Sequence, residues 1–174
     1  MKTKFKKNKI FKISSLLLTS VLMTSVSGCN KNQSESSEAI DLSTSYISNY
    51  IKNNVVFKDD LQKIDDEEIL QKLYPGIDIS YISEFSVSTS ASGATAEELS
   101  IFKLNNKAYI DDIKQIINNR IAEQKSNFEN YIPEEVYKIE NSVINENKDE
   151  NIVAYISCDT PDDIEILFEK LYNK

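Results

Sequence analysis

Residues 98–130 read ELSIFKLNNKAYIDDIKQIINNRIAEQKSNFEN, and this stretch decides the fold. Its first seven residues indicate a strand, the Asn105-Asn106 pair turns the chain, and a long helix follows from Lys107 to about Asn130. Residues spaced at the helical period line one face of that helix: Ile110, Ile113, Ile117, Ile121, Gln124 and Phe128. The stretch therefore predicts a strand, a turn and a helix packed by one apolar face.

The segment before this stretch also has the period of a strand. Residues 84–89 alternate apolar side chains with serines, and a loop of small residues (91–95) then leads to Glu98. The spacing from Thr95 to Glu98 fits a capping box, which predicts a turn of helix before the strand. The polar side of residues 84–90 consists of Ser86, Ser88 and Ser90. We expect this side of the sheet to remain open to solvent.

The segment after it repeats the order of two strands and a helix. Residues 142–146 and 152–158 indicate a hairpin, and Thr160-Pro161 has the chemistry of a helix start, with a final helix to about Tyr172. The order ββα-ββα reflects either a duplication or two similar helix starts. We predict an α+β fold: a two-layer sandwich with a four-stranded, mostly antiparallel sheet and its helices on one face.

One or two helices precede this unit in the chain. Apolar residues at helical spacing predict the first helix over about residues 38–53. The run Asp65 to Glu68 has capping-box spacing, with Asp65 as N-cap, and predicts a second, short helix that Pro75-Gly76 ends.

The N-terminus has the order of an export signal. Six lysines in the first twelve residues precede an apolar stretch from Ile13 to Val26, which is short for a transmembrane helix. The sequence Val26-Ser27-Gly28-Cys29 then resembles the lipobox of bacterial lipoproteins. That resemblance implies cleavage before Cys29, a diacylglyceryl group on its thiol with two acyl chains such as palmitate, and anchoring at the extracytoplasmic face of the cell membrane. The alternative is an uncleaved signal anchor with an incidental cysteine.

We therefore divide the chain into a signal peptide (1–28), a lipidated cysteine with a polar tether (29–38) and one globular domain (39–174). Loss of the six signal lysines leaves 14 basic against 28 acidic residues, a formal net charge of −14. This charge argues against a nucleic-acid partner. The chain has no histidine, so Ser-His and Cys-His pairs and His-bearing zinc sites are excluded. We predict no cofactor, no metal and no catalytic residues.

The loop at Ser92, Gly93 and Thr95 is the one tentative ligand site in the sequence. Its small side chains expose backbone amides, which can form an anion-binding nest. The alternative is a turn in which Gly93 takes a positive φ and Thr95 caps a short helix. One glycine does not make a phosphate-binding loop, which favours the turn.

Other reactive side chains have structural interpretations. Cys158 shares a strand face with apolar residues and is expected to be buried. Of the four acidic pairs or runs, at 65–68, 111–112, 134–135 and 162–163, most lie at expected helix starts, where the helix dipole favours them. The tyrosines are expected to pack in the core with their hydroxyls toward water, unless a group of them marks an interface.

Residues 82–122 resemble a known family. A strand, the sequence SGATAEE (92–98), a strand containing IFK (101–103) and an amphipathic helix follow one another as in the lipoprotein family catalogued as domain of unknown function 4358. The resemblance spans roughly residues 61–171. It implies a cell-surface lipoprotein of Gram-positive bacteria and supplies no activity.

Three hypotheses for function follow. The first is a non-catalytic binding or accessory lipoprotein of the envelope, whose partner is another envelope protein or a small ligand. The alternative is a carboxylate-dependent hydrolase acting on cell-wall material, because glycosidase carboxylates need no fixed sequence spacing. The third is a structural or inhibitory subunit of a membrane complex. Two inward-facing acids in a cleft, away from helix starts, would favour the hydrolase.

Overall fold

The sheet is built from two hairpins that lie side by side. The computed structural model describes residues 42–173, so the predicted signal peptide, Cys29 and the tether lie outside the described residues. The strands are β1 (Leu61–Ile64), β2 (Ile82–Ser90), β3 (Glu98–Leu104), β4 (Val143–Asn147) and β5 (Ile152–Ser157). The helices are α1 (Thr44–Asn54), α2 (Glu67–Leu73), α3 (Ile110–Tyr131), α4 (Val136–Glu140) and α5 (Pro161–Tyr172).

These strands form one open antiparallel sheet in the order β1-β2-β3-β5-β4. The predicted mixed α+β class with an antiparallel sheet is therefore confirmed. The predicted count of four strands is wrong, because β1 pairs with β2 at one edge, Leu61 opposite Ser90. Two of the four residues of β1 are exposed, so the segment carries little of the apolar signal that indicates a strand.

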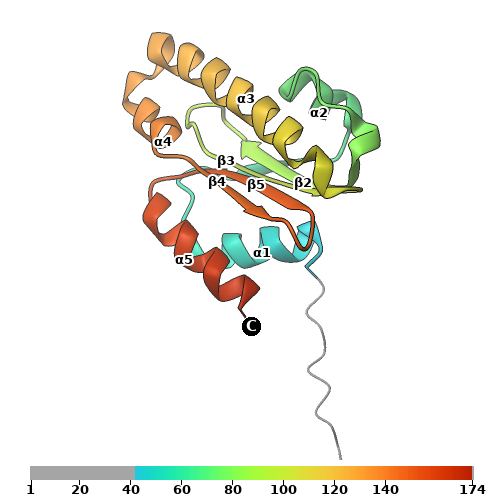
Figure 1. Ribbon diagram of the computed structural model, residues 1–174. Coiled ribbons are helices and arrows are strands. Elements are labelled where there is room, and N and C mark those ends of the chain that lie inside the picture. Colours follow the sequence, from blue (N-terminus) through green and yellow to red (C-terminus); the bar gives the residue numbers. More distant parts are fainter. Residues whose placement is uncertain (1–41, 174) are drawn as a thin grey trace, which may run out of the picture. The chain divides into compact units, whose positions relative to one another are not determined.

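Helices cover both faces of the sheet, and the predicted two-layer arrangement is wrong. Figure 1 shows α2, α3 and α4 on one side and α1 and α5 on the other. On the α1 side, Leu99 and Ile156 pack with Ile47 and Phe168. On the α3 side, Phe102 and other apolar residues of the sheet pack with the isoleucines of α3. The physical reason is visible in β5, whose six residues are all buried, as a strand covered on both faces requires.

The side of β2 that carries the serines is covered by α1 and is not open to solvent. Ser86 is 5% exposed and Ser88 is fully buried, and α1 packs against β2. The Nζ of Lys52, on α1, donates to the Oγ of Ser88 at 3.0 Å. The expectation of an open sheet face is therefore wrong, because the polar side chains of β2 face other polar side chains of α1.

Several helix boundaries differ from the sequence prediction. Asp66, and not Asp65, is the N-cap of α2, and its carboxylate accepts from the amides of Glu68 and Ile69. No helical turn precedes β3, so the capping box predicted from Thr95 is wrong. The short helix α4 was not predicted, since only five residues form it after a 3-10 turn at Pro133–Glu135.

Candidate functional site

The loop that joins β2 to β3 is held by an acid from a distant part of the chain. The carboxylate oxygen Oδ2 of Asp59 accepts from the amide of Ser92 at 3.0 Å and from the hydroxyls of Ser90 and Ser92, each at 2.5 Å. These hydrogen bonds lower the pKa of Asp59 to about 2. Gly93 has a φ of +69°, as predicted for a turn.

The loop amides therefore have acceptors within the protein. The amide of Gly93 donates to the Oγ of Ser90, and that of Ala94 donates to the Oγ of Ser92, both at 3.1 Å. Further along, the Ala96 amide donates to the buried carboxylate of Glu135 at 3.0 Å. An external anion would have to displace Asp59 from the loop. The anion that the sequence suggested for this loop is thus supplied by the chain itself.

Two consecutive acids end the loop and reach different networks. Glu98 begins β3 and is fully buried on the α3 side. Its Oε1 accepts from Ser100 and from the hydroxyl of Tyr74, and its Oε2 accepts from Gln124 at 2.8 Å. The guanidinium of Arg120 donates to the same Oε2 at 3.2 and 3.3 Å. Every lone-pair direction of this carboxylate has a donor or cation near it, so its charge is compensated inside the protein.

Glu97 is held by a second cation. Its Oε1 lies 3.2 Å from the Nζ of Lys138, whose side chain is fully buried. The same Nζ lies 2.9 Å from Glu135 and 3.4 Å from Asp159. Burial acts to lower the pKa of Lys138, but the hydrogen bonds and charges of Glu135 and Glu97 outweigh it, and the pKa is raised. This ammonium joins the loop to α4 and to the end of β5.

Glu97 also fixes the chain that carries Asp59. Its two oxygens accept from the backbone amides of Lys58 and Asp59, both at 2.9 Å. The hydroxyl of Thr95 donates to its Oε2 at 3.2 Å, so Thr95 supports the carboxylate and caps no helix. Asp59 in turn holds Ser92. The two acids, one from each segment, therefore lock the loop and residues 58–59 together.

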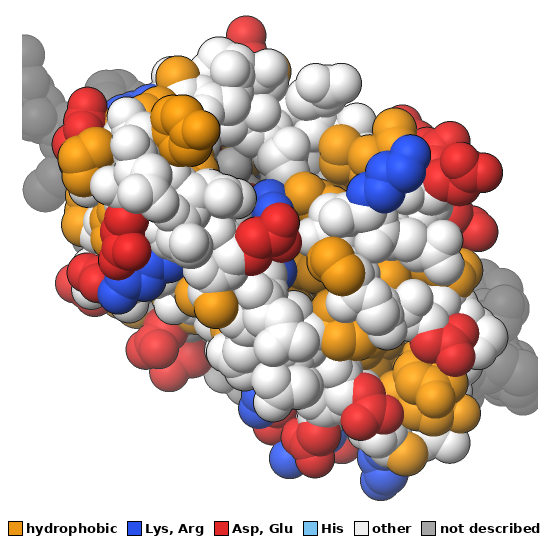
Figure 2. Space-filling view, turned by 90° about the horizontal axis from the view of Figure 1, so that it is seen from above, with side chains coloured by type: hydrophobic (Ala, Val, Ile, Leu, Met, Phe, Trp, Pro, Cys, Tyr) orange, Lys and Arg blue, Asp and Glu red, His pale blue; other side chains and the backbone are white. Residues whose placement is uncertain are grey.

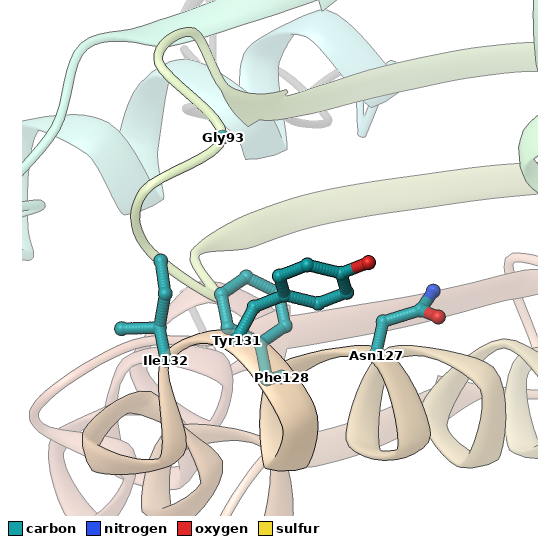
Figure 3. Close-up of a pocket in the computed structure, with 5 residues that line it drawn as sticks. All are labelled: Gly93, Asn127, Phe128, Tyr131 and Ile132. Carbon is teal, nitrogen blue, oxygen red and sulfur yellow. The ribbon is translucent and has the colours of Figure 1, made fainter.

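A small apolar pocket lies beside Gly93. It has a volume of about 160 Å³ and is lined by Gly93, Asn127, Phe128, Tyr131 and Ile132. Figure 3 shows the four side chains rising from the C-terminal end of α3 toward the loop. Phe128 and Ile132 are half-buried, whereas Tyr131 is 85% exposed and forms the rim. An engineered apolar cavity of about 150 Å³ in another protein holds benzene, so this pocket has room for one aromatic or branched side chain.

The structure brings only part of the predicted site to this pocket. Gly93 lines it, while the side chain of Ser92 is turned to Asp59 and that of Thr95 to Glu97. Asp59 and the pocket residues from α3 were missed. Phe128 was predicted to belong to the packing face of the helix. Its position at the end of that face is the one feature of the sequence that could have indicated its place in the pocket.

Other predicted features lie where helix chemistry or burial explains them. Asp111 and Asp112 are in the first turn of α3, and Asp162 and Asp163 are in the first turn of α5, as expected. Cys158 is a free, buried thiol, and burial raises its pKa. Tyr74 and Tyr155 are fully buried with hydroxyls bonded to Glu98 and Gln124, so these two hydroxyls are not in water as predicted.

The described part of the chain offers few other sites. Within residues 42–173, no group of His, Cys, Asp and Glu side chains could hold a metal ion, and no helix has the length and apolar character to cross a bilayer. Figure 2 shows charged side chains of both signs interspersed over the face that carries α3, with apolar side chains in separate groups. This face has no basic patch of the kind that binds nucleic acid.

The fold and the loop define a class of small mixed α+β domain in which acidic side chains from other segments hold the loop that connects two strands. The family described as Domain of unknown function (DUF4358) matches residues 53–158, which include the loop, both hairpins and α3. The chain belongs to this family. A search of curated proteins found no match. A search of solved structures also found none.

Proposed function

We propose that this protein is a non-catalytic binding protein of the cell envelope, anchored through Cys29, whose domain binds an apolar side chain of a protein partner. The observation that carries the proposal is the pocket between Gly93 and the end of α3, with Tyr131 at its rim. Tyrosine and phenylalanine are enriched where partner proteins bind. The lipobox and the tether support an extracytoplasmic location.

Rigidity of the pocket supports a binding role. Its loop wall is fixed by Asp59 and Glu97, which are in turn fixed by Ser90, Ser92 and Lys138. A wall held in this way loses little conformational freedom when a partner docks, which favours affinity. The acids that lock the loop are thus assigned to positioning and not to chemistry.

The carboxylate-dependent hydrolase has less support. Glu97 and Glu98 do face inward away from helix starts, but each is about fully buried, and each lies against a cation. A general acid or nucleophile of a glycosidase must reach the bond it cleaves. Neither residue lines the pocket beside Gly93. Assay of the full chain on purified peptidoglycan tests this directly: release of soluble fragments, lost in a Glu98→Gln variant, would favour the hydrolase.

Two variants of matched exposure test the binding role. Tyr131→Ser removes the rim of the pocket, and Val56→Ser alters a side chain of similar exposure (83% against 85%) in the α1–β1 connection. The full-length protein is cross-linked briefly in its native membrane and purified in mild detergent. A stoichiometric companion that is retained by Val56→Ser and lost by Tyr131→Ser supports the proposal. A companion retained by both would place the binding surface elsewhere.

The anchor is tested separately. Cys29→Ser is expected to abolish incorporation of labelled palmitate and to move the protein from the detergent phase to the aqueous phase on phase separation. Detergent-phase partitioning that persists in Cys29→Ser would indicate an uncleaved signal anchor instead.

A further inference from the structure

Helix α1 carries a polar stripe next to its apolar face. Ser45, Ser48, Asn49 and Lys52 recur at the spacing i, i+3, i+4 and i+7, so they lie on one side of the helix. Ile47 and Ile51 define the adjacent side and enter the core. This polar stripe is not simply a solvent-facing surface, because Ser48 is only 4% exposed and is enclosed against the sheet.

The sheet presents polar side chains opposite this stripe. Lys63 of β1 pairs with Ser88 of β2, so both side chains point to the same face of the sheet as Ser86. A pocket of about 230 Å³ lies between the two layers, and its lining is Ser45, Ser48, Asn49, Lys52, Lys63 and Ser86. All six of these side chains can donate hydrogen bonds, two carry a positive charge, and none is acidic.

Two of the lining serines are almost fully buried as residues. Ser48 and Ser86 are 4% and 5% exposed, and both line the pocket. A serine hydroxyl can donate a hydrogen bond to the acceptor oxygen of a ligand. Both serines share the pocket with the two lysines, so the hydroxyl donors and the cations point to one ligand position.

Positive charge is concentrated at this pocket. Burial and the charge of Lys63 lower the pKa of Lys52. Lys52 donates to the Oγ of Ser88, and Lys63 lies 2.5 Å from Asp65, outside the lining. One of the two cations is thus paired with a neutral group and the other with an acid that an anion could replace. An anion bound between the two lysines would offset the repulsion that the charge of Lys63 exerts on Lys52.

We propose that the pocket between α1 and the β1–β2 edge binds a phosphate-type oxyanion. Lys52 and Lys63 supply the charge, and Ser48 and Ser86 donate to the oxygens. Lysine serves phosphate as a point charge, so no arginine is required. The same chemistry fits a soluble phosphate compound and the phosphodiester of an anionic lipid headgroup. The site is separate from the pocket beside Gly93 and does not depend on the function proposed for it.

Titration of the full chain in mild detergent tests the site. Inorganic phosphate is added at constant ionic strength against chloride, and the amide resonances of Ser48 and Ser86 are followed. Saturable shifts that chloride does not produce are expected. Lys52→Met is expected to weaken phosphate binding at least 10-fold, and Asp65→Asn to strengthen it. The control Lys107→Met, which alters a lysine outside the lining, is expected to change nothing.

Two further arms complete the test. Lys63→Met changes a side chain that is 60% exposed, so it retains the fold even if Lys52→Met does not, and it too should weaken binding. Vesicles of phosphatidylglycerol, compared with phosphatidylcholine, distinguish a lipid headgroup from a soluble ligand: the same shifts on phosphatidylglycerol alone identify the headgroup. Shifts that do not saturate, or equal affinity in the wild type, Lys52→Met and Lys63→Met, would overturn the proposal.

Discussion

Arg120 and Glu98 form a buried ion pair that joins the middle of α3 to the first residue of β3. Two guanidinium nitrogens of Arg120 lie 3.2 and 3.3 Å from Oε2 of Glu98, whose side chain is fully buried. Because Glu98 directly follows the loop that contains Gly93, this pair ties the end of that loop to the helix that carries the other wall of the apolar pocket.

Loss of the Arg120 guanidinium is expected to destabilise the fold strongly. Arg120→Met leaves Glu98 as a buried charge with only neutral donors, which costs about 3 kcal/mol in the free energy of unfolding. Adding Glu98→Gln to Arg120→Met removes that charge and should restore part of the loss. Urea unfolding of the two single variants and the double variant measures the coupling. Strictly additive effects would show that the two side chains do not interact in solution.

Lys138 is expected to be as important as Arg120, in contrast to exposed lysines. Lys138→Met leaves Glu97 and Glu135 without their buried cation and should lower the free energy of unfolding by about 3–5 kcal/mol. Lys125 pairs with Glu140 at 2.7 Å, but both side chains are about half exposed. Lys125→Met should therefore cost less than about 1 kcal/mol. Equal losses in the two variants, measured by urea unfolding, would contradict the role of burial.

The contrast between these two lysines shows what the sequence could predict. Periodicity predicted β3, the packing face of α3 and the β4–β5 hairpin, because local apolar patterns determine them. It could not show that Lys138 is buried, since a lysine on a five-residue helix has the same local pattern whether it faces water or an acid. The helices on both faces of the sheet follow from the apolar character of both sides of β5, whose six residues are all buried.

The candidate site was predictable in part for the same reason. SGATAEE marked the loop, and Gly93 adopts the positive φ that its position suggested. The partner of the loop, Asp59, lies more than thirty residues earlier in the sequence, and no local pattern connects it to Ser92. The apolar pocket likewise needs the end of α3 to meet the loop, which is a property of the tertiary structure.

Asp59 makes the loop sensitive to acid. Its pKa in the folded protein is about 2, below the ordinary value of 3.8, so the folded state favours the ionised carboxylate. The stabilisation that Asp59 provides is complete above about pH 4 and is lost as the pH falls through about 2. The difference in urea midpoint between the wild type and Asp59→Asn should therefore be constant near neutrality and shrink below pH 4. A difference that stays constant down to pH 2 would contradict an ionised Asp59 in the loop.

A comparison of Gly93 with Gly76 distinguishes the effect of backbone strain from an effect on the wall of the pocket. Gly93 and Gly76 have φ values of +69° and +88°, and a Cβ added at either would meet no atom within 4 Å. Gly93→Ala and Gly76→Ala should each lower the free energy of unfolding by about 1–2 kcal/mol, from backbone strain alone. Only Gly93→Ala places a methyl group at the pocket, so only this variant should weaken capture of the partner that depends on Tyr131. Equal capture by Gly93→Ala and Gly76→Ala, at matched stability, would remove the loop from the binding surface.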